Sequence, residues 1–184
     1  MLLDQKRTRR MVQIVAILTS LAFAGVIFVV LGLILFGGGG NTAADDILSD
    51  AKKAVEQSPT SADAYEDLAS AYRGKDDLPN AIIAARKAVS LDPNDLGRVQ
   101  TLVTLQVDQG NTEGVLTTLQ NFTKRNPKNA DAFLLLAQQA EAAGRTPLAR
   151  LSYLTFLRLA PDDPNAEAIR QRITELDATG ATTG

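Results

Sequence analysis

Adjacent carboxylates are the residues in this sequence whose spacing comes closest to a chemical site. Asp76 and Asp77 form one pair, and Asp162 and Asp163 form another. Carboxylate oxygens are good ligands for Ca²⁺ and Mg²⁺, but two adjacent acids without a third ligand are weak evidence for a metal site. Both pairs also fall at the start of an expected helix, where acidic side chains stabilise the helix dipole. We therefore expect no metal site at either pair.

The chain has no His and no Cys, two residue types that take part in much of enzyme chemistry. Their absence excludes His-based acid/base catalysis, Ser-His-Asp triads, thiol nucleophiles, disulfides and thiolate zinc sites. The run Gly37–Gly40 follows an apolar segment and precedes no expected strand, so it does not indicate a phosphate-binding loop. A catalytic pair of carboxylates stays open as the least favoured alternative. We expect no enzymatic activity and no cofactor.

The net charge of −2 over 184 residues is unevenly distributed. Residues 1–10 carry a net side-chain charge of +3, whereas residues 45–177 contain 20 acidic and 15 basic residues, a net charge of −5. An acidic surface repels phosphates, which argues against nucleic acid as a partner. We interpret the basic N-terminus as a determinant of membrane topology rather than as a site for anionic lipid.

An uncharged apolar run extends from Val12 to Phe36. As a helix its 25 residues span about 37 Å, which exceeds the roughly 30 Å thickness of a bilayer core. The nearby Lys and Arg residues all precede the run, and the first charge after it is Asp45. This asymmetry predicts a basic cytoplasmic tail (1–11), a transmembrane helix (12–36) and a single-pass protein of the cell membrane, with the C-terminal part periplasmic or extracellular.

The alternative for the apolar run is a cleaved signal peptide, although the apolar region of such a peptide is usually shorter, about 7–15 residues. Small residues recur at Ala16, Ser20 and Ala24, a spacing that allows two anchors to approach and associate weakly. Residues 37–44 are expected to form a flexible Gly-rich linker. Residues 178–184 lack apolar periodicity and are expected to be a disordered tail.

A repeat period of roughly 34 residues organises the rest of the chain. It relates Pro59, Pro93, Pro127 and Pro161. Apolar positions follow the same period, in the columns Tyr65, Val99 and Phe133; Leu68, Leu102 and Leu136; Ala81, Val115 and Ala149; and Ala88, Phe122 and Phe156. A period of this length indicates stacked supersecondary units. Within each period the apolar spacing fits two helices separated by a turn.

This pattern resembles the tetratricopeptide repeat, a helix–turn–helix unit of about 34 residues. The motif residues are Tyr65, Leu68, Ala69, Tyr72, Ala81, Ala88 and Pro93 in the first unit, and Phe133, Leu136, Ala137, Ala149, Tyr153, Phe156 and Pro161 in the third. The resemblance implies an all-α fold, a short α-solenoid within residues 45–177 whose three full units lie at about 62–95, 96–129 and 130–163. A leading helix (45–57) and an amphipathic capping helix (164–177) bring the expected number of helices to eight.

The middle unit is the weakest match to the family. Val103 stands where the family prefers Gly or Ala for close helix packing, and Gln106 stands where it prefers an aromatic residue. Leu102, Phe122 and Pro127 nevertheless keep this unit in register. We therefore expect its helices to pack less closely than those of the other units.

In the tetratricopeptide repeat family the first helix of each unit lines a concave groove that takes a peptide or a partner helix. By resemblance, the candidate binding residues are Asp63, Glu66, Asp67, Ser70 and Arg73 of the first unit, Gln100, Thr101 and Thr104 of the second, and Leu134, Leu135, Gln138 and Glu141 of the third. This groove is expected to grade from acidic to apolar, because Leu136 is a core position and the two leucines before it should be partly exposed. A partner would supply a basic residue and then an apolar anchor.

Two functions fit these features. The first is a membrane-anchored scaffold or adaptor that mediates protein–protein interaction outside the cytoplasm, for example in the assembly or biogenesis of an envelope complex. The alternative is a structural subunit of one fixed membrane complex, which would use its convex or end faces rather than the groove. In both cases the membrane is contacted through Val12–Phe36.

Overall fold

The computed structural model describes residues 43–181. The predicted cytoplasmic tail, the predicted transmembrane helix 12–36 and nearly all of the linker 37–44 lie outside the described residues, as do residues 182–184. Among the described helices, none is both long enough and apolar enough to cross a membrane.

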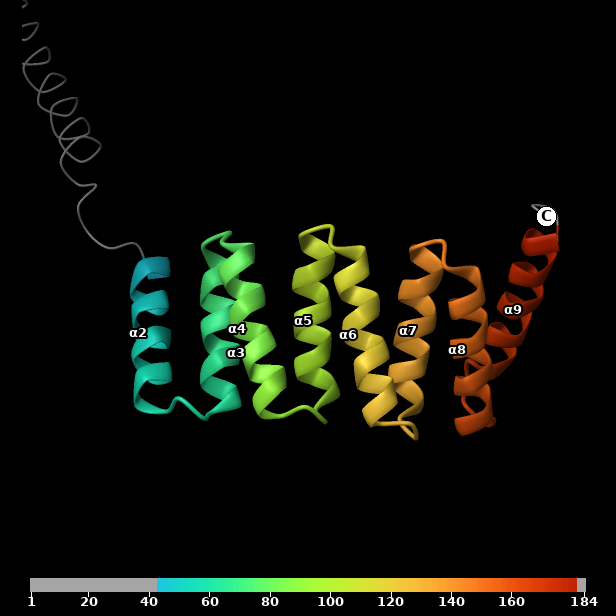
Figure 1. The fold of residues 1–184 in the computed structure, drawn as a ribbon, viewed down its shortest axis with the longest axis horizontal. Helices are drawn as coiled ribbons and strands as arrows, with labels where there is room; N and C mark the ends of the chain where they lie inside the picture. Colours follow the sequence, from blue (N-terminus) through green and yellow to red (C-terminus); the bar gives the residue numbers. More distant parts are fainter. Residues whose placement is uncertain (1–42, 182–184) are drawn as a thin grey trace, which may run out of the picture. The chain divides into compact units, whose positions relative to one another are not determined.

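The described part of the chain is all-α, and residues 43–181 contain no strand. They form eight helices: α2 (Ala43–Gln57), α3 (Ala62–Gly74), α4 (Leu78–Leu91), α5 (Leu96–Asp108), α6 (Thr112–Arg125), α7 (Ala130–Ala142), α8 (Thr146–Leu159) and α9 (Ala166–Ala181). Figure 1 shows these helices side by side in a row from α2 to α9. Each packs chiefly on its neighbours in sequence. The expected all-α repeat fold is confirmed for these residues.

The bounds of the helices repeat with the period found in the sequence. The first helices α3, α5 and α7 start one period apart, and so do the second helices α4, α6 and α8. The end of α2 at Gln57 lies one period before the end of α4 at Leu91. The leading helix α2 is therefore in register with the second helices of the full units.

Each turn between a first and a second helix contains one residue in the left-handed region. The φ angle is 58° at Asp76, 74° at Gly110 and 68° at Gly144, which are equivalent positions. Glycine adopts this conformation at little cost, whereas a residue with a Cβ atom is strained there. Asp77 is the N-cap of α4, since its carboxylate accepts a hydrogen bond from the N–H of Asn80 at 3.2 Å. The first acidic pair thus serves a turn and a cap.

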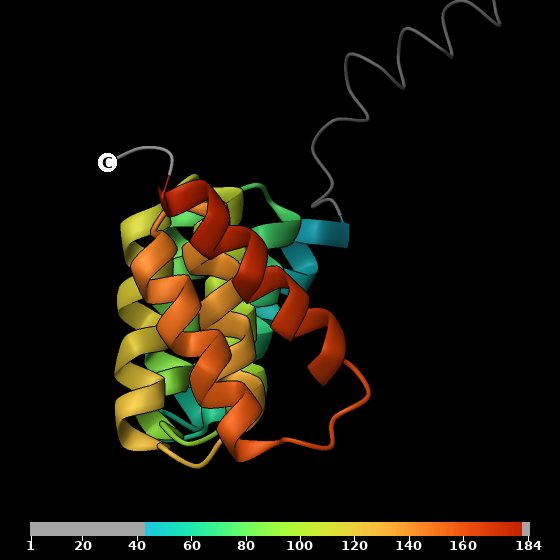
Figure 2. The same ribbon diagram turned by 90° about the vertical axis from the view of Figure 1, so that its right-hand side faces the viewer.

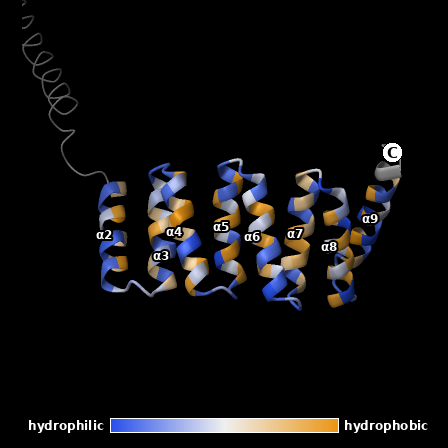
Figure 3. Ribbon diagram, viewed as in Figure 1, coloured by the Kyte–Doolittle hydropathy of each residue, from blue (hydrophilic) through white to orange (hydrophobic). Residues whose placement is uncertain are grey.

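The hydrophobic core runs between the first and second helices along the whole array. Its fully buried residues are Ala69, Ala81, Val99, Leu119, Phe122, Ala132, Ala137, Ala140 and Ala149. Figure 3 shows apolar and hydrophilic residues alternating along each helix, as expected for helices with one buried face. Because many core residues are alanines, the helices can approach closely, and the core depends on close contact rather than on bulky side chains.

The middle unit departs from this alanine-rich packing. The helices α5 and α6 approach each other over fewer residues than α3 and α4 or α7 and α8 do. Large buried residues such as Val103 stand in its core, and helix separation grows with side-chain size. Gln106 is 1% exposed, and its side-chain oxygen accepts a hydrogen bond from the hydroxyl of Thr118 at 3.1 Å. The looser packing expected for this unit is confirmed.

The two terminal helices differ in length from the expected ones. α2 begins at Ala43, earlier than expected and inside the segment assigned to the linker. α9 ends at Ala181, inside the segment 178–184 that was expected to be disordered. The apolar periodicity used to set the expected bounds does not detect such extensions of one or a few residues beyond the last buried position. α9 buries Ile169 and Ile173, and Figure 2 shows it crossing the end of the array obliquely.

Candidate partner-binding groove

The candidate residues lie on the first helices, and side chains join the first two of these helices directly. Arg73 of α3 donates a hydrogen bond to Asp108 of α5 at 2.8 Å. The hydroxyl of Thr101 on α5 lies 3.2 Å from the carboxylate of Glu66 on α3. Helices α3 and α5 therefore present one continuous surface across two units.

A pocket of about 340 Å³ opens in this surface between α3 and α5. It is lined by Ala69, Ser70, Arg73, Gly97, Gln100, Thr101, Thr104 and Leu105. Five of these residues are candidates from the sequence, and they come from two different units. Ala69 and Leu105 are buried and supply the apolar part of the lining. The structure thus brings the polar candidates of the first and second units together.

The polar atoms of this pocket are held by the helices that carry them. The hydroxyl of Thr104 donates a hydrogen bond to the carbonyl oxygen of Gln100 at 2.9 Å. The hydroxyl of Thr101 has the carbonyl oxygen of Gly97 as a second acceptor, at 3.2 Å. A hydroxyl that donates its proton in this way keeps lone pairs with which to accept. The pocket can therefore accept hydrogen bonds from a peptide N–H or an ammonium group and receive an apolar side chain on Leu105.

One arginine offsets part of the negative charge at the acidic end of the candidate groove. Arg98 of α5 pairs with Asp63 and with Glu66 of α3, both at 2.5 Å, and its side chain is only 13% exposed. The carboxylates of Asp92 and Asp95 lie 3.6 Å and 3.7 Å from its buried Nε atom. The hydrogen bond with Asp63 raises the pKa of Arg98. This end of the groove is consequently less acidic than the sequence alone suggests.

The candidate residues of the third unit lie outside the pocket, whose lining comes from α3 and α5 alone. Leu134 and Leu135 are half-buried against the hydrophobic core, and Leu136 is buried. Gln138 is exposed. The carboxylate of Glu141 is bound to α9, as described below. The third unit therefore offers a partner Gln138 and the exposed edges of two leucines, and not a charged residue that is free of partners.

Glu141 joins the third unit to the capping helix. It pairs with Arg172 of α9 and accepts a hydrogen bond from the hydroxyl of Tyr153 on α8 at 2.9 Å. The hydrogen bond with Arg172 lowers the pKa of the Glu141 carboxyl. Burial, reinforced by Glu141, raises the pKa of Tyr153 to about 12. Because this cluster links three helices, we assign it a structural role.

The residues that sequence reasoning missed are the partners of the candidates, namely Arg98, Asp108 and Arg172. The repeat period contained a signal for the first of these. Residue 98 is one period after residue 64, so on α5 it occupies the position equivalent to the residue that follows Asp63 on α3. A long side chain at this position can therefore reach Asp63 on the preceding first helix. For Arg172 there was no such signal, because α9 lies outside the repeats and its docking angle does not follow from their period.

Comparison with known proteins agrees with the repeat pattern. The sequence profile of the tetratricopeptide repeat matches residues 30–95 and 101–164, which together exceed half of the chain. Its first match begins inside the apolar run at the N-terminus. No curated protein matches the chain at a significant level.

Solved structures share the fold at low sequence identity. MamA is 16% identical with a TM-score of 0.52, over 77% of this chain and 98% of that chain. A tetratricopeptide repeat protein from Parabacteroides merdae is 16% identical with a TM-score of 0.58, over 72% and 53% of the two chains. YrrB is 18% identical with a TM-score of 0.51, over 72% and 74%. The chain therefore belongs to the tetratricopeptide repeat family, whose stacked helices mediate protein–protein interaction.

Proposed function

We propose that this protein is a membrane-anchored adaptor that binds a protein or peptide partner outside the cytoplasm through the surface of its first helices. The observation that carries the proposal is the pocket between α3 and α5, which combines an apolar base with hydroxyl and amide groups. Extended peptides are commonly held by such a combination, because main-chain hydrogen bonds set the register and an apolar side chain adds affinity. YrrB, which has a similar fold, is described as having an unusual peptide-binding site.

The sequence supports the anchor and its orientation. The run Val12–Phe36 is uncharged, and basic residues precede it whereas acidic residues follow it. An anchored adaptor of this kind holds its partner close to the membrane, which suits the assembly or biogenesis of an envelope complex. The Gly-rich segment between the anchor and α2 suits such a tether, because glycine gives a chain conformational freedom.

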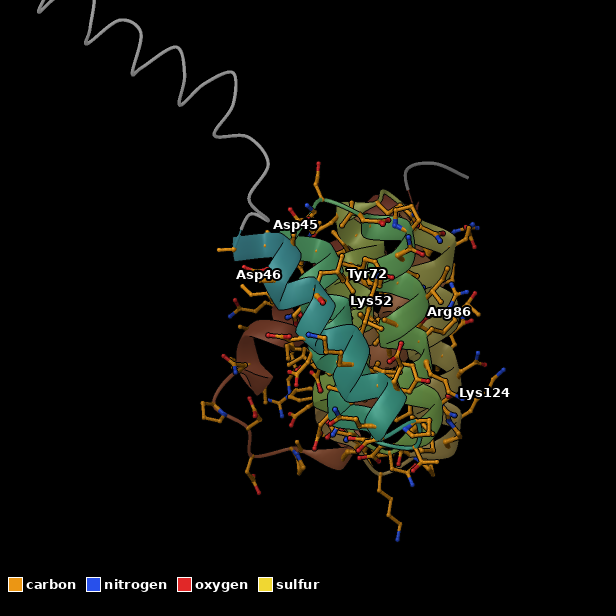
Figure 4. The ribbon with its side chains drawn as sticks, turned by 90° about the vertical axis from the view of Figure 1, so that its left-hand side faces the viewer. Asp45, Asp46, Lys52, Tyr72, Arg86 and Lys124 are labelled. Atoms are coloured by element: carbon orange, nitrogen blue, oxygen red, sulfur yellow. The ribbon has the colours of Figure 1, made fainter. Side chains whose placement is uncertain are left out.

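A second candidate function is a structural subunit of one fixed membrane complex, which would use the opposite face. The second helices expose Ile83 (62%), Leu151 (62%) and Leu154 (40%). Basic residues project from the second helices as well, as Figure 4 shows for Arg86 and Lys124. Exposed aliphatic residues beside basic ones are suited to a permanent partner with acidic and apolar groups.

In-cell crosslinking of the full-length protein, followed by affinity capture, separates these two functions. Thr104→Arg blocks the pocket between α3 and α5, and Leu151→Arg is the matched variant on a second helix, where the side chain is 62% exposed. If the groove binds the partner, the partner is lost from Thr104→Arg and retained by Leu151→Arg. The reverse pattern would favour the structural subunit.

The Leu134→Asp and Leu135→Asp changes test the apolar end of the candidate groove. Because both leucines are half-buried, their loss of binding counts only if the melting temperature stays close to that of the unaltered protein. Leu136→Asp is the control for a buried position. If the double variant melts as early as Leu136→Asp, the two leucines belong to the core and not to the binding surface.

Membrane attachment is tested separately by fractionation of cells that produce the full-length chain. The protein is expected to stay with the membranes after an alkaline wash. Phe23→Arg combined with Ile27→Arg places two charges near the middle of the apolar run and is expected to release the protein from the membranes, since each charge near the middle of a spanning helix costs about 3 kcal/mol. Recovery of the unaltered chain in the soluble fraction would contradict the anchor.

A further inference from the structure

The leading helix α2 is a second helix without a first helix before it in the described part of the chain. Its end at Gln57 precedes the end of α4 by one period, and Pro59 follows it as Pro93 follows α4. In each full unit the first helix packs against the second helix of its own unit, and in the first unit α3 also lies beside the next first helix, α5. The corresponding place beside α2 and α3 has no occupant among residues 43–181.

A cleft of about 560 Å³ marks this place. It is lined by Ala44, Ile47, Asp50, Ala51, Ala54, Asp67, Ser70, Ala71 and Gly74, from α2 and α3. Figure 4 views the array from this end, with α2 in front. The lining is mostly apolar and small, and it holds the carboxylates of Asp67 and of Asp50, the latter paired with Lys53 of the same helix at 3.0 Å. Among the described residues Ile47 is one of the most exposed large aliphatic side chains, at 60%.

The residues that line the cleft have equivalents one period later in the sequence. In the first full unit, those equivalent residues are covered by the first helix α3. The equivalents of Ile47 in the three full units are Ala81, Val115 and Ala149, which are 0%, 2% and 0% exposed. Ala54 of α2 is half-buried, whereas its equivalent Ala88 of α4 is 1% exposed; Ala51 and Ala71 are already buried, at 8% and 5% exposed. The cleft therefore has the form of a receptor for a first helix.

The charges of the cleft specify the helix that fits. One period after Asp67 is Thr101, whose hydroxyl faces Glu66, the fifth residue of α3. Two periods after Asp50 is Thr118, whose hydroxyl donates to Gln106, the eleventh residue of α5. In the cleft these two hydroxyl positions hold carboxylates instead. A helix seated there would place its fifth and eleventh residues against acidic groups, so basic residues are favoured at both.

We propose that this cleft binds a basic amphipathic helix of another protein, which completes a fourth repeat unit. The helix carries large apolar residues at its fourth and seventh positions, a small residue at its eighth, and Lys or Arg at its fifth and eleventh. The chain's own residues in this register are 28–40, which have Gly32 at the fifth position, Leu35 at the eighth and Gly38 at the eleventh. They supply neither basic residue.

A defined peptide tests the proposal on the full-length protein in detergent. The probe has the sequence of residues 62–77 with the changes Glu66→Lys and Tyr72→Lys, so that it carries the apolar and small positions of α3 and basic residues at positions five and eleven. A control peptide keeps the sequence of α3. Fluorescence anisotropy is expected to show binding of the probe at least about tenfold tighter than binding of the control.

Two matched variants locate the binding. Ile47→Asp is expected to weaken binding of the probe by at least about tenfold, because a central apolar contact is replaced by a charge. Ile83→Asp should leave binding unchanged, since Ile83 is equally exposed, at 62%, but lies on α4 away from the cleft. Asp50→Asn with Asp67→Asn should weaken binding of the probe and reduce its dependence on salt. Equal binding to Ile47→Asp and Ile83→Asp would overturn the proposal.

Two other occupants have their own signatures, and either one overturns the proposal. If residues 28–40 fill the cleft within the same chain, the thiol introduced by Ile47→Cys will react much more slowly with a maleimide than the thiol introduced by Ile83→Cys. If a second copy fills it, the unaltered protein will dimerise with concentration and Ile47→Asp will abolish the dimer. Because the chain has no native Cys, each introduced thiol reports on one site.

Discussion

The two ends of the repeat array are finished differently. At the C-terminal end α9 buries Ile169, Ile173 and Leu176 and is fastened to the third unit through Arg172 and Glu141. At the N-terminal end α2 leaves Ile47 60% exposed beside an open cleft. Stacked repeats need a covered face at each end, because an uncovered unit exposes its core to water. The difference shows that only one end is closed by the described residues, and the other end is suited to an incoming helix.

Truncation of an aliphatic side chain to alanine is expected to give the largest difference between the two ends in the free energy of unfolding. Ile173→Ala should lower the free energy of unfolding by about 2–3 kcal/mol, because Ile173 is 7% exposed and its loss leaves a cavity under α9. Ile47→Ala should change it by less than about 0.5 kcal/mol, because Ile47 is largely in water. Urea unfolding followed by circular dichroism measures both. Equal losses would mean that Ile47 is covered in solution.

The ion pair between Glu141 and Arg172, which attaches α9 to the third unit, should make the stability of the fold depend on pH in the acid range. Arg172 lowers the folded-state pKa of Glu141 below its ordinary value, so the ionised carboxylate stabilises the fold above the unfolded-state pKa, and this contribution is lost as the pH falls through the lower folded-state pKa. Glu141→Gln should cost about 1 kcal/mol at neutral pH and weaken the acid dependence of unfolding. Glu113→Gln is the control, since Glu113 forms an exposed pair with Arg145. An unchanged acid dependence in Glu141→Gln contradicts this role.

Tyr153, in the same cluster, should make the fold less stable as the pH rises, whereas Glu141 makes it less stable as the pH falls. The pKa of Tyr153 is raised to about 12 in the folded state from an ordinary 10.0. The neutral phenol therefore stabilises the fold fully below pH 10, and this contribution is lost as the pH rises toward 12. Tyr153→Phe should cost about 0.5–1 kcal/mol at neutral pH and remove that alkaline loss. Thermal melts over this pH range, compared with Tyr65→Phe at a half-buried tyrosine, provide the test.

The smallest effect is expected in the turns near the two ends. Asp76 adopts a positive φ of 58° in the unit next to the open end, and Gly144 adopts 68° at the equivalent position next to the closed end. Asp76→Gly should stabilise the fold by about 0.5 kcal/mol, and Gly144→Asp should destabilise it by a similar amount, because only the residue with a Cβ atom is strained there. Equal and opposite shifts in melting temperature are expected, and shifts of the same sign would exclude backbone strain as the cause.

Much of the fold could be predicted because the repeat pattern is local. The constant spacing of Pro59, Pro93, Pro127 and Pro161 placed every turn between units, and the apolar columns placed the helices between those turns. Val103 and Gln106 also predicted the less close packing of the middle unit, since both depart from the repeat's residue pattern at buried positions. These features depend on residue type and spacing within one unit, which a sequence displays directly.

The candidate site could be predicted only in part. Ser70, Arg73, Gln100, Thr101 and Thr104 do meet in one pocket, because they occupy related positions on adjacent first helices. The acidic end did not keep its expected character, because Arg98 reaches back from α5 to Asp63 and Glu66. Contacts of this kind depend on how far apart the helices stand and on which rotamers long side chains adopt, and neither is encoded in the period.

The sequence by itself determined the repeat family, the register of each unit and the positions that form the core, because each follows from periodic burial of apolar residues. Only the tertiary structure decided which charges are neutralised, where α9 docks, and that a cleft beside Ile47 lies open at the other end. These last features arise between units and at the ends of the array, where the repeat rule no longer applies and the outcome depends on three-dimensional distances between side chains that are far apart in the chain.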